Sequence, residues 1–141
     1  MNRLILEPTE VGVINGACAE FCGTAHAQMG FRVVVVPETE FTEYVRAQAQ
    51  PAAVPESEGL DLFIRNGCAA CHAIRGTPAD GVVGPDLTHL ASRRTIGAGI
   101  VPTTVENIAD FVASPDHFKP GIEMPAFGML PKDEIAQIAA W

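Results

Sequence analysis

Residues 66–76 read NGCAACHAIRG, and this stretch decides which fold the sequence predicts. It contains Cys68, Cys71 and His72 in the Cys-x-x-Cys-His pattern of covalent c-type haem attachment. Two thiols separated by two residues can reach the two vinyl groups of one porphyrin, and the adjacent histidine then lies under the iron. A bare Cys-x-x-Cys could equally be a redox dithiol or half of a zinc site. No second Cys-x-x-Cys follows at zinc spacing, and no strand leads into this one, so haem attachment is favoured.

A ligand for the other side of the iron is expected in residues 118–128, FKPGIEMPAFG. Met124 stands there between a Gly-containing turn and Pro125, whereas Met129 is the rival ligand at similar distance along the chain. We prefer Met124 because the following proline holds the chain extended and points the methionine one way. The alternative role for Met124 is a gap-filling core thioether. Histidine–methionine ligation leaves no open coordination position, which predicts electron transfer and not oxygen binding.

Three segments near these motifs have the apolar spacing of helices, at residues 57–74, 103–114 and 131–141. Ser57 is the expected N-cap of the first, Thr103 or Thr104 caps the second, which stops before Pro115, and Pro131 lies in the first turn of the third. Their expected inward residues are Leu60, Phe63, Ile64, Val105, Ile108, Ala109, Val112, Ile135, Ile138 and Ala139. The C-terminal part is therefore predicted to be a small helical haem domain whose porphyrin supplies much of the apolar contact.

A second cluster of soft ligands lies near the N-terminus, in CAEFCGTAHAQM at residues 18–29. Cys18, Cys22, His26 and Met29 fall within it, and thiolate, imidazole and thioether together select copper over harder ions. The alternative is a disulfide between the two cysteines with a bystander histidine. The other histidines, His89 and His117, are expected to be loop or surface residues and not metal ligands.

The segments around the cluster are predicted to be mainly β structure. Residues 3–7 alternate, residues 11–21 lead a strand into the ligand loop, and residues 31–37 are a β-branched run ended by proline. Residues 38–48 read as a short helix, and residues 47–57 as a stiff, solvated Ala/Pro/Gln tether.

Residues from about 58 to 141 resemble a class I cytochrome c. GPDLTHLASRRTIGAG at residues 84–99, with KPGIEMPAFG at residues 119–128, resembles the variety fused to subunit II of caa3-type haem-copper oxidases. The resemblance implies that Cys68 and Cys71 anchor haem c, His72 is the proximal ligand and Met124 the distal one. It also implies that the carbonyl of Pro85 accepts a hydrogen bond from His72.

Two arginines of this region, Arg93 and Arg94, are candidates to face the haem propionates. Their alternative role is that of solvated loop charges, and the sequence leaves both roles open.

Residues 18–29 resemble the binuclear copper (CuA) loop of the same subunit. The resemblance implies that Cys18 and Cys22 bridge two copper ions, His26 and Met29 cap opposite ends, and the backbone carbonyl of Glu20 is a weak ligand. The predicted fold is therefore multi-domain. Residues 1–46 are a partial all-β cupredoxin-like CuA segment, residues 47–58 an Ala/Pro linker, and residues 59–141 an all-α class I cytochrome c domain.

The sequence departs from the family pattern at its beginning, because the family's membrane helices, most of its copper domain and an upstream histidine ligand have no counterpart before His26. We therefore expect this chain to be the C-terminal part of a longer subunit. A barrel reduced to its last strands is also expected to expose sheet edges.

Charge and the resemblance together set the expected function. The net charge of -8 excludes nucleic-acid binding, and no apolar run reaches the roughly 18 residues that span a bilayer. The resemblance implies the electron-entry part of cytochrome c oxidase, an enzyme of the respiratory chain. Electrons would pass from a soluble donor, such as a cytochrome c, through haem c and copper to haem a of catalytic subunit I, where oxygen is reduced.

The expected location is the periplasm or the outer face of the bacterial plasma membrane, with membrane association through the missing N-terminal helices. One alternative is a soluble monohaem cytochrome c with a non-functional copper segment. Another is a redox or copper-delivery protein that uses Cys18 and Cys22 as an exchangeable dithiol.

Overall fold

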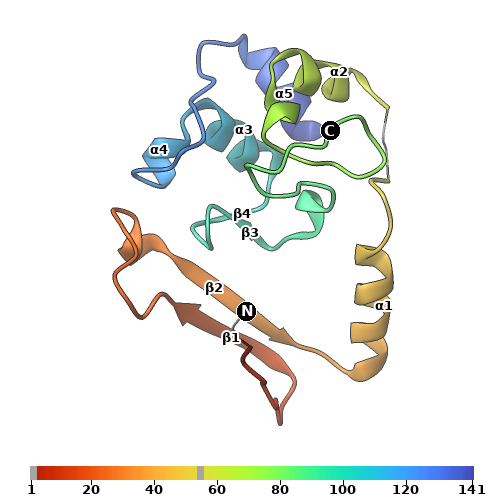
Figure 1. The fold of residues 1–141 in the computed structure, drawn as a ribbon, viewed down its shortest axis with the longest axis vertical. Helices are drawn as coiled ribbons and strands as arrows, with labels where there is room; N and C mark the ends of the chain where they lie inside the picture. The colour runs from red at the N-terminus through yellow and green to blue at the C-terminus, as the bar shows by residue number, and fades with distance from the viewer. Residues whose placement is uncertain (1–2, 54–55) are drawn as a thin grey trace.

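The computed structural model of the chain describes residues 3–53 and 56–141. Figure 1 shows a β-hairpin and one helix below a group of short helices, with a two-stranded β turn between them. The elements are, in chain order, β1 Gly12–Ala17, β2 Gly30–Val35, α1 Glu38–Gln48, α2 Glu58–Arg65, β3 Thr95–Ile96, β4 Val101–Pro102, α3 Val105–Ala113, α4 Pro115–Phe118 and α5 Lys132–Ala140. None of the helices in the described residues is long and apolar enough to cross a bilayer.

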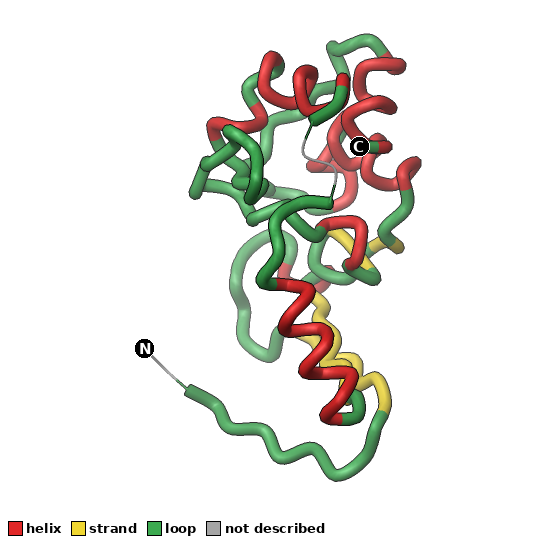
Figure 2. The backbone as a smooth tube through the Cα atoms, turned by 90° about the vertical axis from the view of Figure 1, so that its right-hand side faces the viewer, coloured by secondary structure: helices red, strands yellow, loops and turns green. Residues whose placement is uncertain are grey.

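The N-terminal part is an antiparallel hairpin in which β1 pairs with β2, from Gly12 opposite Val35 to Ala17 opposite Gly30. The two strands predicted around the ligand loop are therefore confirmed. The alternating residues 3–7 form no strand, so that prediction was wrong. Figure 2 shows this segment running as a loop outside the hairpin. Alternation alone does not make a strand, because a strand also needs a neighbour to accept its hydrogen bonds.

A cupredoxin barrel is not what the described residues form. Among the described residues of the N-terminal part, the hairpin is the whole sheet. Several of its apolar side chains are exposed, for example Ile14 at 59% and Phe31 at 56%. The strand predicted at residues 31–37 is present as β2 but is not buried in a core, since its burial would require a second sheet. The chain as a whole is mixed α and β.

The predicted helix at residues 38–48 is confirmed as α1, which begins directly after Pro37 and carries Glu38 and Glu40 at its positive end. It continues two residues past the domain boundary predicted at residue 46. Of the linker residues, 54 and 55 lie outside the described structure. The tether was predicted to be solvated, but the backbone N–H of Ala52 donates to the carbonyl of Arg75 (2.9 Å), so this part lies against the helical part.

The three helices predicted in the C-terminal part are confirmed as α2, α3 and α5. Ser57 caps α2 by accepting from the N–H of Leu60 (3.3 Å), and Thr104 caps α3 by accepting from the N–H of Asn107 (3.1 Å). The same part also contains the β3–β4 pair, which the all-α prediction did not include.

The core of this part lies where α5 packs against α2, and α5 also packs against α3. The buried cluster consists of Leu62, Phe63, Ile74, Ala79 and Ile138. Ile64 was predicted to face inward but is 40% exposed, because the buried side of α2 is the one that carries Leu62 and Phe63.

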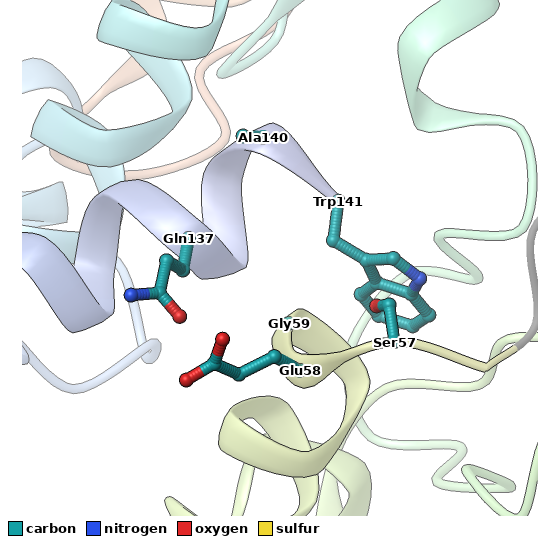
Figure 3. A pocket seen from close by; sticks show the side chains of 6 residues that line it. All are labelled: Ser57, Glu58, Gly59, Gln137, Ala140 and Trp141. Atoms are coloured by element: carbon teal, nitrogen blue, oxygen red, sulfur yellow. The ribbon is translucent and has the colours of Figure 1, made fainter.

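Gly59 allows the close crossing of α2 and α5. A Cβ atom at this position would collide with Trp141 and lie 2.8 Å from the carbonyl of Gln137. Figure 3 shows the shallow pocket beside this crossing, where Trp141 lies next to Ser57. Glu58 is the pocket's one carboxylate, and none of the predicted ligands lines it.

Candidate metal centres

The Cys-x-x-Cys-His loop follows α2 without a break. Gly67, at a φ of 79°, takes the left-handed conformation that ends the helix, and Cys68 begins a single 3-10 turn. The N–H groups of Cys71 and His72 both donate to the carbonyl of Cys68, at 3.1 and 3.0 Å. Both cysteines are free thiols, and burial raises the pKa of the Cys68 thiol. The loop therefore presents two unpaired thiols and an imidazole from one tight turn.

The ring of His72 is oriented by a backbone carbonyl. Its Nδ1 lies 2.8 Å from the oxygen of Pro85. Because a carbonyl can only accept, Nδ1 is the donor in this contact, and Nε2 takes no part in it. This is the contact predicted between these two residues, and it fixes the orientation of the ring and of Nε2, the nitrogen that can bind a metal.

Two glycines that the sequence argument missed allow this arrangement. A Cβ atom on Gly84 would lie 2.5 Å from the His72 ring, and one on Gly81 would lie 2.6 Å from the backbone nitrogen of His72. The N–H of Gly84 also donates to the carbonyl of Cys71 (2.7 Å). The available signal was the glycine that directly precedes Pro85, but only the fold shows that the imidazole lies against it.

Asp86 stabilises the turn that carries Pro85. Its Oδ1 accepts from the N–H of Thr88 (2.8 Å), and the Thr88 hydroxyl and N–H together lower the pKa of this carboxyl below its ordinary value. Nη2 of Arg93 donates to the Asp86 carbonyl (2.5 Å), so Arg93 contributes to the same turn.

Met124 and Met129 differ in exposure. Met124 is half-buried, whereas Met129 is 78% exposed. In the part of the chain that the structure describes, no hydrogen bond joins Met124 to His72. Two ligands of one haem iron bind on opposite faces of the porphyrin, so they are not expected to contact each other directly.

The buried hydroxyl of Thr103 is consistent with a bound haem, whose propionate groups are hydrogen-bond acceptors. Among the described residues, the hydroxyl of Thr103 is the one buried side-chain polar atom without a hydrogen-bond partner. Its backbone N–H donates to the carbonyl of Arg94 (3.2 Å), which places it beside a residue predicted to face the haem propionates. A propionate oxygen would satisfy the hydroxyl, so the residues present fit the haem.

The second centre is the loop between β1 and β2. The N–H of Cys18 donates to the carbonyl of Met29 (3.0 Å), which closes the loop directly beyond the paired ends of the strands. Gly23, at a φ of 125°, reverses the chain, and its carbonyl accepts from the N–H of His26 (3.0 Å). The hairpin therefore brings together ligands from both ends of the twelve-residue stretch.

All of the donor atoms predicted in this loop converge. Sγ of Cys22 lies 3.4 Å from Sγ of Cys18, 3.6 Å from Nδ1 of His26 and 3.6 Å from Sδ of Met29. Sγ of Cys18 lies 3.1 Å from the carbonyl oxygen of Glu20. The ligand atoms of Cys18, Cys22 and His26 all lie within 4.8 Å of one another.

The electrostatics of the loop suit a soft cation. Both cysteines are free, so the structure does not form the disulfide weighed as an alternative. The hydrogen bond with the Cys18 thiol raises the pKa of Cys22, and repulsion between two neighbouring thiolates acts in the same direction. Phe21, 77% exposed, has its ring 5.7 Å from that of His26, a contact that sequence spacing did not reveal. Sulfur and imidazole donors in this arrangement fit copper.

Comparison with known proteins identifies a cytochrome c domain in this chain and oxidase subunits among its relatives. The sequence model of the Cytochrome c family matches residues 56–141. The chain is 31% identical over 144 residues to cytochrome c oxidase subunit 2 of Alkalihalophilus pseudofirmus, with 99% of the chain and 41% of the relative covered. It is 31% identical to the subunit 2 of a Bacillus species, strain PS3, with 88% and 37% covered. For that of Bacillus subtilis the identity is 32%, with 83% and 34% covered.

The chain spans about two fifths or less of the length of these curated relatives. The predicted resemblance to a subunit 2 that ends in a cytochrome c domain is confirmed over most of the chain. A cytochrome c domain implies covalently bound haem c. The chain belongs to the cytochrome c family through residues 56–141, and it is similar over most of its length to cytochrome c oxidase subunit 2.

Proposed function

We propose that this chain is the electron-transfer part of subunit 2 of a haem-copper terminal oxidase. The observation that carries the proposal is the convergence of four side-chain donors and one carbonyl in residues 18–29 of a chain that also holds a cytochrome c domain. The names of the relatives support it, since each is a cytochrome c oxidase subunit 2.

In this proposal the domains are residues 1–46 for the copper segment, 47–58 for the linker and 59–141 for the cytochrome c domain. When bound, haem c and a binuclear copper centre would supply one-electron transfer, from a soluble donor such as a cytochrome c through haem and copper to haem a of catalytic subunit I. Oxygen reduction belongs to that subunit.

The haem ligands are assigned from the contacts described above. Cys68 and Cys71 would form the two thioether bonds, and His72 would bind the iron through Nε2, since Nδ1 donates to Pro85. Met124 is the better sixth ligand because it is half-buried while Met129 is largely exposed. With both axial positions filled by protein, the iron would exchange electrons without binding oxygen.

The copper ligands are assigned in the same way. Cys18 and Cys22 would be the thiolate ligands of the two ions, His26 and Met29 would be further ligands, and the carbonyl of Glu20 a weak one. The donors already lie within contact distance of one another, so a change of oxidation state would require little movement of the protein. Small movement favours fast electron transfer.

We further propose membrane association through N-terminal helices of a longer subunit and a location in the periplasm or on the outer face of the plasma membrane. The names of the relatives support an oxidase subunit, so catalytic subunit I is the expected partner.

Rapid photoreduction of the haem in the copper-loaded chain tests the proposal. We expect the haem to be reoxidised as the copper centre is reduced, at a rate independent of protein concentration. The Cys22→Ser variant is the matched control, in which the haem should stay reduced. A rate that rises with protein concentration, or no electron transfer to copper, would contradict the proposal and favour the diffusible cytochrome.

A further inference from the structure

The loop of residues 18–29, with its copper-ligand candidates, is called the copper loop below. The cytochrome c domain contacts the end of this loop at the turn between β3 and β4. The backbone N–H of Gly30, next to the predicted ligand Met29, donates to the carbonyl of Ala98 (2.9 Å). A Cβ atom on Gly99 would lie 3.4 Å from the Gly30 backbone, so these two segments of the chain approach each other closely. Figure 1 shows this turn between the hairpin and the helices.

The backbone of this turn is unusual. Gly97, Ala98 and Gly99 all have positive φ, at 64°, 65° and 87°. Ala98 is the one residue other than glycine with positive φ in the described part of the chain. An alanine is held in this conformation only where the surrounding contacts require it. Here the result is a carbonyl directed at the N–H of Gly30, and we call residues 97–99 the docking turn.

A second contact joins the copper loop to the segment that carries Met124. Gly121, at a φ of 77°, approaches Thr24 so closely that a Cβ atom there would lie 3.3 Å from the Thr24 Cβ. Met124 follows three residues later. The copper loop is thus in contact both with the docking turn and with the segment that holds the sixth haem ligand.

A third contact holds the end of α1 and the following residues. Nη2 of Arg75 donates to the carbonyl of Gln48 (2.6 Å), the last residue of α1, and Nε2 of His89 donates to the carbonyl of Gln50 (3.0 Å). Arg75 and His89 both belong to the cytochrome c domain. The start of the linker is therefore bound to that domain and does not act as a free tether.

We propose that the docking turn fixes the cytochrome c domain on the copper loop, so that the two centres form one rigid body with a set separation. A free tether would instead let the haem domain sample many positions, and transfer would wait for productive encounters. The use of the contact for electron transfer rests on the proposed function. The docking itself involves only contacts within this chain and can be tested without copper.

Amide NMR of the haem-loaded 141-residue chain tests the docking. We expect one rotational correlation time for amides of β1 and β2 and of α2, α3 and α5, together with slow hydrogen exchange at Gly30. In Gly99→Val, a β-branched side chain at positive φ would press on Gly30. Exchange at Gly30 should then rise about tenfold or more, and the two parts should tumble separately.

Two controls keep this result specific. Gly12→Val places the same side chain in open space on β1 and should leave Gly30 protected. Ala98→Gly keeps the carbonyl but removes the side chain from the positive-φ position, so docking should be retained. Two correlation times in the unaltered chain, or an unchanged Gly30 exchange rate in Gly99→Val, would overturn the inference.

The outcome also separates this inference from the proposed function. Docking observed in a chain that binds no copper would support the inference and contradict the proposed function. Independent tumbling in a chain that does bind a copper pair would overturn the inference and leave the proposed function standing.

Discussion

The copper loop and the haem loop, residues 68–72, both present two cysteines and a histidine. The structure brings their ligands together to different degrees. In the copper loop, Cys22 lies within 3.6 Å of donor atoms from three other residues. In the haem loop, His72 contacts its carbonyl partner Pro85, while Met124 belongs to a distant segment.

The difference follows from the size of the two groups. Copper ions are small, so the ligands of a copper pair must almost touch one another, and a closed hairpin loop can supply them all. A porphyrin separates its axial ligands, so the protein can orient each one in advance but cannot bring them into mutual contact. One site is therefore set by local sequence, and the other depends on how distant segments pack.

The largest expected effect separates the two pairs of cysteines. Replacing Cys68 and Cys71 together with serine should abolish covalent haem, because no thiol remains for the vinyl groups. The matched control replaces Cys18 and Cys22, and it should retain covalent haem in full. Haem staining after denaturing electrophoresis measures both variants. Covalent haem in the first variant would contradict the assignment.

The next effect concerns the centre of the copper loop. Cys22→Ser should eliminate the copper pair, since its sulfur lies next to Cys18, His26 and Met29. Copper content after removal of weakly bound metal measures the loss, with Cys71→Ser as a control that should bind copper normally. A full copper pair in Cys22→Ser would show that the loop is not the site.

A smaller effect distinguishes the two methionines. Met124→Leu should lower the haem reduction potential by about 0.1 V or more, because axial ligands set the potential over a range of roughly 0.8 V. Met129→Leu should leave it nearly unchanged, since Met129 is 78% exposed. Redox titration compares the two. The reverse result would make Met129 the sixth ligand.

A glycine under the histidine gives an effect on stability. In Gly84→Ala the new methyl would lie 2.5 Å from the His72 ring, so the ring or the turn must shift. Overpacking of this kind costs about 1 to 3 kcal/mol, which chemical denaturation of the haem-loaded chain would detect. Gly12→Ala, in open space, is the control and should change stability little.

The smallest effect is pH-dependent and concerns Asp86, in the turn that carries Pro85. Hydrogen bonds from Thr88 hold the pKa of Asp86 below its ordinary value of 3.8. The carboxylate therefore favours the folded state above about pH 3.8, and this contribution is lost as the pH falls through the lowered pKa. Asp86→Asn should cost about 1 kcal/mol or less near neutral pH and nothing in strong acid. Chemical denaturation from neutral to acid pH measures the difference in the free energy of unfolding between Asp86→Asn and the unaltered chain. A difference that stays constant with pH would contradict this role.

Local spacing predicted the donor atoms that converge in residues 18–29, because they lie within twelve residues and a hairpin brings them together. It also predicted α2, α3 and α5, since each has an apolar face of its own and α2 and α3 each begin at a capping residue. It failed for residues 3–7, where the alternation was present but no partner strand was.

Contacts between distant segments could not be predicted from the sequence. The approach of Gly84 to His72 and the bond from Gly30 to Ala98 join parts of the chain that no local pattern relates. A glycine in the sequence indicates only that the backbone is free to adopt unusual angles, and it does not show which neighbour makes the glycine necessary.

The central claim is that one short chain provides both a haem site and a binuclear copper site. The most direct test is the iron and copper content of the chain, produced in a host that attaches c-type haem and then reconstituted with copper. The account predicts one iron with about two copper ions per chain. One iron with no copper would contradict the copper centre, and no iron would contradict the haem assignment.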